Sequence, residues 1–296
     1  MSAKITIGLC TKNSEATVRK TISSIINQKY PKELIQLIVV DGCSKDKTLS
    51  IINSATSKAG TTFETYSDKG EGLGYARQIV VNNAQGKYVL FVDSDVILSS
   101  DFVRNEVEFM EKNHEIAVAF GVSIVKEGSF REKTLTGRVS DLAAYALDKS
   151  SSVACEATIF RFAAIQEIGG FDTRIKGAAE DRDLIARIGL SGMQVSVNHG
   201  ARFLHKQRAT LSSFWSEKSW MGYGDHYFYH KQGSRGAFWR KFLFGDFVFG
   251  MKLSSKAYEL TYRKLSFLII PQIILGNLAW WVGFTKGHLN KYGHKM

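Results

Sequence analysis

Apolar and polar positions alternate along the N-terminal part of the chain in a way that predicts strands and helices in turn. Residues 5–9 and 34–40 are short, nearly continuous apolar runs, which is typical of strands buried on both faces of a sheet. Between them, residues 15–28 repeat apolar positions such as Val18 and Ile22 at helical spacing. The order strand, helix, strand indicates a βαβ unit.

The same alternation continues to residue 92. Helical periodicity returns at residues 47–59 and 74–84, and strand-like runs lie at residues 63–66 and 88–92. We therefore predict an α/β fold of the Rossmann-like kind, with a mainly parallel sheet flanked by helices. Folds of this kind bind their ligands at the carboxyl ends of the strands.

Polar side chains occur where each of these predicted strands ends. They are Thr11 and Asn13, Asp41, Asp68, and Asp93 with Asp95. Because the carboxyl ends of parallel strands meet at one edge of a sheet, we expect these side chains to lie close together. The sequence therefore places the functional site at this edge.

The remainder of the chain is patterned less regularly. A strand is expected at residues 157–161, a helix opening at Glu180, and a further strand at residues 201–204. Residues 126–136 and 148–152 are polar clusters, which we assign to loops beside the site.

The net charge of +11 is concentrated at the C-terminal end. Residues 1–201 carry 24 Lys and Arg against 24 Asp and Glu, whereas residues 202–296 carry 15 against 4. The same end holds residues 266–284, nineteen positions without a charge, which as a helix would reach roughly 28 Å, close to the core of a bilayer. A basic approach to an apolar segment favours a membrane, not nucleic acid, as the partner.

These features divide the chain into three predicted parts. Residues 1–210 form the catalytic domain, residues 211–264 a basic, aromatic, amphipathic region at the membrane interface, and residues 265–296 an apolar membrane segment with a short basic tail. The sequence opens without the apolar core of a signal peptide, so the catalytic domain is expected to face the cytoplasm at the cell membrane. The alternative is a buried helix in a soluble dimer, and the oligomeric state stays open.

Asp93 and Asp95 are the candidates for metal ligation. They lie two positions apart after an apolar strand, so both carboxylates project from one side if the extended geometry continues. Like charges held this close repel each other unless a cation lies between them. Mg²⁺ or Mn²⁺ suits this role, because hard cations bind carboxylate and diphosphate oxygens together. Alone, the Asp-x-Asp string is also compatible with an ordinary turn after a strand.

Several short blocks accompany this acidic pair. They are Thr11-Lys-Asn13, Asn27-Gln-Lys-Tyr-Pro31, Val39-Val-Asp41-Gly-Cys-Ser44, Gly72-Leu-Gly-Tyr-Ala-Arg77, Phe91-Val-Asp93-Ser-Asp95, Gly169-Gly-Phe171-Asp172 and Glu180-Asp181. In order and spacing, these blocks make residues 3–210 resemble glycosyltransferase family 2. The resemblance implies a GT-A fold and inverting transfer of a sugar from a nucleotide-sugar donor.

The resemblance also implies a nucleotide site. Asp41 resembles the family's contact to the nucleotide base, and Asp68 a second contact to base or ribose. Thr11, Asn13 and Arg77 would belong to the same site. The family commonly has an aromatic residue directly after the first motif's threonine, whereas this chain has a lysine there, so base stacking at that position is in doubt.

The catalytic and metal-binding roles follow from the same resemblance. Asp93 is expected near the ribose and the metal, Asp95 as a direct metal ligand, and His205 as a third ligand. Asp181 resembles the general base, which takes the proton from the acceptor hydroxyl as that hydroxyl attacks the anomeric carbon. The other carboxylates of residues 180–183 compete for this role, and an acidic run also simply favours the start of a helix.

The overall reaction is expected to be metal-dependent transfer of one sugar, a hexose, from a UDP- or GDP-sugar to a lipid-linked or membrane-proximal glycan. Processive members of the family carry Gln-x-x-Arg-Trp, and the nearest string here, at residues 232–236, has no Trp. One alternative is a polyprenyl (dolichyl)-phosphate sugar synthase. Another is an inactive, membrane-tethered protein that binds nucleotide sugar without turning it over.

Overall fold

The computed structural model describes residues 4–57, 62–124, 134–147, 156–206, 210–231 and 243–291. The chain divides into two compact units. The first is Met1–Ile124, Ser152–Arg174 and Glu180–Lys206, and the second is Val125–Ser151, Ile175–Ala179 and Gln207–Met296. Residues 126–133 of the first polar cluster, the second cluster at residues 148–152 and the string at residues 232–236 lie outside the described residues. The loop prediction is wrong for the end of the first cluster, because Leu135 and Thr136 begin the helix Leu135–Ala146.

The first unit contains an eight-stranded mixed sheet in the order β3-β2-β1-β4-β7-β6-β8-β5. Its strands are β1 (Ile5–Thr11), β2 (Ile35–Asp41), β3 (Thr62–Ser67), β4 (Tyr88–Asp93), β5 (Val96–Leu98), β6 (Ile116–Ser123), β7 (Ala157–Arg161) and β8 (Gln194–His205). Strands β3, β2, β1 and β4 pair in parallel, which confirms the predicted α/β repeat. Strand β7 pairs antiparallel with β4 and β6, and β5 pairs antiparallel with β8.

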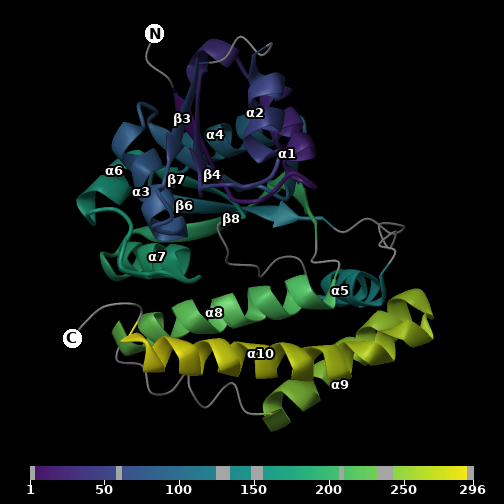
Figure 1. Cartoon of the computed structure of the whole chain (residues 1–296). Coiled ribbons are helices and arrows are strands. Elements are labelled where there is room, and N and C mark those ends of the chain that lie inside the picture. The colour runs from purple at the N-terminus through teal and green to yellow at the C-terminus, as the bar shows by residue number, and fades with distance from the viewer. Residues whose placement is uncertain are drawn as a thin grey trace. The chain divides into compact units, whose positions relative to one another are not determined.

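Helices cover both faces of this sheet (Figure 1). They are α1 (Val18–Ile26), α2 (Thr48–Thr56), α3 (Leu73–Asn83), α4 (Phe102–Lys112), α6 (Phe162–Glu167) and α7 (Glu180–Leu190). One buried cluster joins α1, α2 and α4 to alternate residues of the strands, such as Ile7, and a second joins α3, α6 and α7 to the opposite face. The alternation of side chains along each strand thus creates two separate cores.

The second unit is helical in its described part. It consists of α5 (Leu135–Ala146), α8 (Leu211–Lys231), α9 (Leu243–Thr261), the short 3₁₀ helix η3 (Lys264–Leu268) and α10 (Ile269–Leu289). Helices α8 and α10 approach very closely, because a Cβ added to Gly222 would lie 1.9 Å from the carbonyl oxygen of Trp280. The indole of Trp280 also donates to Asp225 Oδ2 at 2.7 Å.

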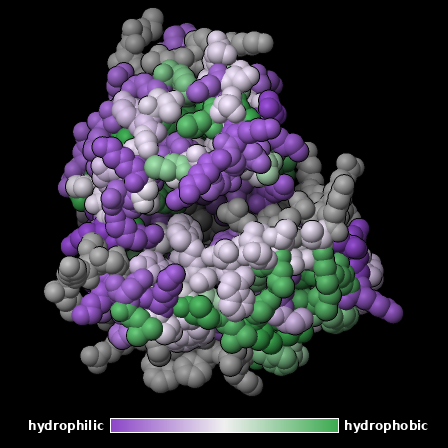
Figure 2. All heavy atoms as spheres, viewed as in Figure 1, coloured by the Kyte–Doolittle hydropathy of each residue, from purple (hydrophilic) through white to green (hydrophobic). Residues whose placement is uncertain are grey.

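Apolar side chains are nevertheless exposed on α9, η3 and α10. They include Phe247, Met251, Phe267, Leu278 and Val282. Figure 2 shows hydrophobic residues gathered over the α9 and α10 part of the face in view. In the described part of the chain, Lys264–Leu289 is long and apolar enough to cross a membrane, and 33% of its most apolar window is buried in the protein.

Candidate active site

Thr11 and Asp41 lie side by side at the predicted edge of the sheet, because they are register partners at the ends of β1 and β2. Both side chains are buried, at 5% and 4% exposure. Asp41 Oδ2 accepts from the backbone N–H of Ser44 at 2.9 Å, but Asp41 Oδ1 and Thr11 Oγ1 have no hydrogen-bond partner among the described residues. Buried polar atoms without a partner are costly, which marks this position as one that a ligand completes.

Asn13 and Asp68 shape the loops around this position. Asn13 adopts a left-handed conformation (φ 48°), and its Oδ1 accepts from the backbone N–H of Lys45. Asp68 accepts from the backbone N–H groups of Gly70 and Gly72, at 2.7 and 3.3 Å, in the loop that leads into α3. The structure therefore brings both predicted residues to the edge and gives each an internal hydrogen bond.

Arg77 connects the end of β4 to the start of α7. It is 2% exposed, and its guanidinium donates to Glu180 Oε1 at 2.5 Å and to Asp93 Oδ1 at 2.9 Å. Burial raises the pKa of Asp93 to about 7, and the Arg77 charge opposes this rise while Asp95 adds to it. Burial likewise raises the pKa of Glu180 against the opposing charge of Arg77.

Asp95 faces His205 across the pairing of β5 with β8. The distance from Asp95 Oδ1 to His205 Nε2 is 3.4 Å, and His205 Nδ1 lies 3.4 Å from Glu156 Oε1 on its other side. Burial alone would lower the pKa of His205, but the hydrogen bond to Asp95 and the charges of Glu156, Asp95 and Asp93 raise it to about 9. A positive charge is thus stabilised where three carboxylates converge.

This group of side chains fits a divalent cation in part. Among the described residues, no three His, Cys, Asp or Glu side chains already surround one ion position. Ligands at right angles around an ion about 2.1 Å away lie about 3 Å apart. The 3.4 Å separation of Asp95 Oδ1 from His205 Nε2 therefore suits two such ligands, with further oxygens left to a diphosphate or water.

The three carboxylates at the start of α7 differ in how deeply they are buried. Glu180 is 2% exposed and pairs with Arg77, while Asp183 is fully buried and accepts from Arg187 Nε at 2.8 Å. Asp181 is half-buried, and its Oδ1 accepts from the following backbone N–H at 2.7 Å. Of the three carboxylates, Asp181 is thus the one with access to a bound molecule.

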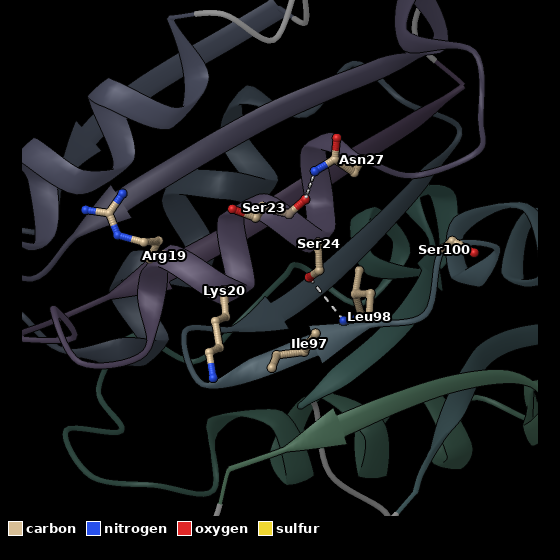
Figure 3. Close-up of a pocket in the computed structure, with 8 residues that line it drawn as sticks. All are labelled: Arg19, Lys20, Ser23, Ser24, Asn27, Ile97, Leu98 and Ser100. Carbon is tan, nitrogen blue, oxygen red and sulfur yellow. Dashed lines mark hydrogen bonds between the residues drawn. The ribbon is translucent and has the colours of Figure 1, made fainter.

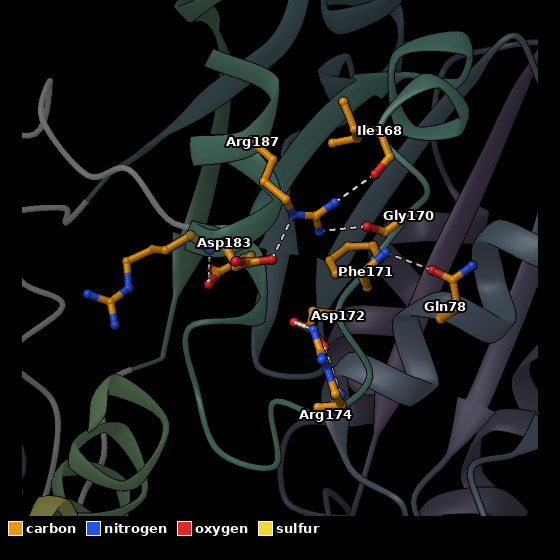
Figure 4. Close-up of polar contacts among 10 residues, drawn as sticks. Gln78, Ile168, Gly170, Phe171, Asp172, Arg174, Asp183 and Arg187 are labelled. Atoms are coloured by element: carbon orange, nitrogen blue, oxygen red, sulfur yellow. Dashed lines mark hydrogen bonds and ion pairs between the residues drawn. The ribbon is translucent and has the colours of Figure 1, made fainter. Parts of the chain in front are cut away.

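The turn at residues 168–171 anchors this helix to α3 (Figure 4). Arg187 donates to the carbonyl oxygens of Ile168 and Gly170, and Gln78 of α3 accepts from the backbone N–H of Phe171 at 2.7 Å. Gly170 has φ 77°, and a Cβ there would lie 2.3 Å from Gln78 Oε1. The glycines of this turn therefore allow the close contact that fixes α7.

A groove of about 530 Å³ runs between α1 and β5 (Figure 3). It is lined by Arg19, Lys20, Ser23, Ser24, Asn27, Ile97, Leu98 and Ser100. Ser24 Oγ accepts from the backbone N–H of Leu98 at 3.1 Å, which holds the helix to the strand. Thr21 of α1 donates to the carbonyl oxygen of Ser94, between the two aspartates, at 3.0 Å. The groove offers two cations and several hydroxyl groups on the same helix that contacts Ser94.

The structure adds one residue to those predicted from the sequence. Glu156 lies directly before β7, and its carbonyl oxygen accepts from the backbone N–H of Asp93 at 2.9 Å. Because β7 is antiparallel to β4, the start of β7 meets the end of β4. An acidic residue preceding the strand was the available signal, but a purely parallel arrangement would have placed it at the opposite edge.

The fold and this edge define a GT-A enzyme, and comparison with known proteins identifies the family. Residues 6–169 match the model described as Glycosyl transferase family 2, and residues 88–283 match Glycosyl transferase family group 2. The chain belongs to glycosyltransferase family 2, as the sequence blocks indicated, and it is a transferase.

Relatives and solved structures agree with this placement. Poly(ribitol-phosphate) beta-N-acetylglucosaminyltransferase TarS of Staphylococcus aureus is 30% identical over 111 residues, which is 38% of this chain and 19% of that protein. Poly(ribitol-phosphate) beta-glucosyltransferase of Bacillus spizizenii is 34% identical over 112 residues, covering 37% and 18%. The structure of mannosyltransferase PcManGT from Pyrobaculum calidifontis, in complex with GDP-Man and Mn²⁺, aligns over 98% of this chain and 88% of that one at 14% identity, with a TM-score of 0.67.

Proposed function

We propose that the protein is a metal-dependent, inverting glycosyltransferase that moves a single sugar from a UDP- or GDP-sugar to a glycan carried on a lipid or close to the membrane. The observation that carries this proposal is the facing pair of Asp95 and His205 beside Asp93. A Mg²⁺ or Mn²⁺ ion held by these residues would stabilise the departing nucleoside diphosphate as a Lewis acid. The presence of Mn²⁺ with the Pyrobaculum mannosyltransferase supports the same assignment.

The nucleotide is assigned to the edge formed by Thr11 and Asp41. Asp41 Oδ1 is a buried acceptor without a partner in the described part of the chain, and a ring N–H of a nucleotide base is a matching donor. Asp68 and Asn13 hold the surrounding loops in place, so we assign them to the same site through the backbone groups that they fix.

We assign to Asp181 the role of the general base that takes the proton from the acceptor hydroxyl. Glu180 and Asp183 are buried, whereas Asp181 is half-buried, so Asp181 is the carboxylate of the run that a bound acceptor can reach. A positioned carboxylate base typically contributes about 10²–10⁴-fold to such a reaction. The other carboxylates of α7 then have structural tasks.

We propose that the acceptor is a glycan that carries phosphate or another anionic group. Two relatives are named for action on poly(ribitol-phosphate), although the aligned part spans less than a fifth of each of them. The groove between α1 and β5 supplies Arg19 and Lys20 for phosphate and Asn27 for hydroxyl groups. A polyprenyl-phosphate sugar is the competing product, and chromatography of the product distinguishes the two.

The test of the reaction measures nucleoside diphosphate released from a panel of UDP- and GDP-sugars, with and without Mn²⁺, in the presence of lipid extract and of polyol phosphate polymers. We expect release with one donor class, and loss of release when Mn²⁺ and Mg²⁺ are chelated. The variant Asp181→Asn is the matched control, because it should bind nucleotide but not transfer. Absence of metal-dependent release with every donor and acceptor would rule the proposal out.

We further propose that the helical unit binds the cell membrane, with the catalytic unit in the cytoplasm. Exposed apolar side chains lie on α9 and α10, and α9 also carries the exposed Lys252 and Lys256. Basic residues beside apolar ones suit an anionic lipid surface. Flotation with anionic liposomes tests this. Binding should persist at high salt and be lost in Leu278→Glu/Val282→Glu, whereas binding that disappears with salt alone would contradict insertion.

A further inference from the structure

Resting on the function proposed above, we propose that Arg77 is a positioning residue: its buried guanidinium ties Glu180 to Asp93 and thereby holds the base Asp181 in place relative to the metal and ribose end of the site. The two carboxylates come from elements far apart in the chain. Asp93 is the last residue of β4, and Glu180 is the first residue of α7.

The contacts of Arg77 favour this role over a direct contact to the nucleotide. Nη1 donates to Glu180 Oε1 at 2.5 Å and Nη2 donates to Asp93 Oδ1 at 2.9 Å, so both ends of the guanidinium are committed to carboxylates. The side chain is 3% exposed, and its guanidinium carbon lies 5.6 Å from the centre of the Phe91 ring. Packing on the ring and two ion pairs fix its orientation.

The location of Glu180 explains what the pair controls. Glu180 directly precedes Asp181, so any movement of the first turn of α7 moves the base with it. The preceding residue, Ala179, has φ 84°, a conformation that an L-residue other than glycine adopts at a cost. Such a backbone conformation persists only where nearby contacts fix it, and the ion pair of Glu180 is one of these contacts.

Stability alone does not explain why the ion pair of Arg77 with Glu180 is buried. Two charges taken out of water often contribute no more to stability than well-packed apolar side chains of the same size. Removal of one partner alone leaves a buried charge and is strongly destabilising. Replacing Arg77 and Glu180 together with apolar side chains removes the fully buried pair and leaves only Asp93, whose side chain is 35% exposed, without Arg77, so stability and positioning separate in this variant.

The experiment compares Arg77→Met, Arg77→Met/Glu180→Met and Glu180→Gln with the wild type. Melting temperature, kcat, acceptor KM and hydrogen exchange of the peptide covering residues 176–186 are measured on the full chain. We expect the double variant to recover most of the melting temperature that Arg77→Met loses, yet to keep a kcat about 100-fold below wild type with a smaller change in KM. Exchange in the first turn of α7 should rise at least several-fold.

Glu180→Gln keeps an acceptor for Arg77 and is expected to fold, with kcat between those of the double variant and the wild type. Glu106→Gln is its matched control, because Glu106 is a second buried carboxylate whose partner is Asn198 and not Arg77. It should leave kcat and the exchange of residues 176–186 unchanged.

Two results would overturn the proposal. One is a double variant with restored melting temperature and wild-type kcat, and the other is unchanged exchange in the first turn of α7. Hydrogen exchange does not depend on knowing the substrate. A wild-type enzyme that is inactive with every donor would therefore count against the proposed function, while the exchange data would still decide whether Arg77 positions α7.

Discussion

Glu106 offers a prediction about stability whose size can be worked from the structure. The side chain is fully buried on α4, and Oε2 accepts from Asn198 Nδ2 at 3.0 Å, while Oε1 has no partner among the described residues. Burial raises its pKa from 4.5 to about 8, and the hydrogen bond from Asn198 opposes the rise. The native protein therefore keeps a proton on Glu106 at neutral pH that the unfolded chain has lost.

The sign of the pH dependence follows from this difference. Between pH 4.5 and 8 the native state binds more protons at Glu106 than the unfolded state, so the free energy of unfolding falls as pH rises. At about 1.4 kcal/mol per pH unit, the cost at pH 7 amounts to roughly 3 kcal/mol. Glu106→Gln keeps a carbonyl for Asn198 and has no proton to lose, so it removes this cost.

Thermal unfolding of the two proteins from pH 5 to pH 8 measures the effect. Glu106→Gln should melt close to wild type at pH 5 and about 5 °C or more above it at pH 8. Glu108→Gln is the matched control, because Glu108 is exposed on the same helix and should show no such trend. A difference between Glu106→Gln and wild type that is constant with pH, or that grows towards acid, would refute the reasoning.

Three further predictions concern the site and the helical unit. Asp181→Asn should lower kcat about 10²–10⁴-fold while calorimetry still detects nucleotide binding; retained turnover would remove it as the base. Asp41→Asn should weaken UDP or GDP binding at least about tenfold without lowering the melting temperature, since it replaces a buried acceptor without a partner by a donor. Gly222→Ala should lower the melting temperature by several degrees, because its Cβ would overlap the carbonyl of Trp280, whereas Gly245→Ala, which has open space, should not.

The N-terminal half of the sheet was predictable because both periodicities are strong there. The apolar runs at residues 5–9, 34–40 and 88–92 correspond to β1, β2 and β4, each within a residue or two of its bounds. Strands β5 and β6 were not predicted. β5 has only three residues, too few to show a period, whereas β6 opens on the buried apolar run Ile116–Phe120, the same kind of signal that predicts β1 and β2.

The chemistry of the site was predictable as a set of residue types, but not as a set of contacts. Polar residues that follow parallel strands meet at one edge of the sheet, regardless of which side chains they contact there. Thr11, Asp41 and Asp93 therefore lie at one edge. The pairing of Asp95 with His205 depends on β5 lying antiparallel to β8, and strand direction of this kind leaves no mark in local periodicity. The division of the chain at residues 210 and 264, and the membrane orientation, stay predictions.

Arg77 illustrates why a motif residue can be found from sequence while its task is not. Its place in the Gly-rich block predicted a helix start near the nucleotide, and α3 begins there. Its side chain, however, contacts Glu180, 103 positions away, and a shift of one to three residues in the predicted start of α7 would have offered Asp181 or Asp183 as the partner. Arg187 anchors α7 through Asp183 and the carbonyl oxygen of Ile168, and this contact fixes which side of the helix faces the sheet. The side that faces the sheet decides which carboxylate of residues 180–183 meets Arg77. Arg187 holds Asp183 and Arg77 holds Glu180, while Asp181 stays half-buried, so the assignment of the base rests on how α7 is held and not on the acidic run itself.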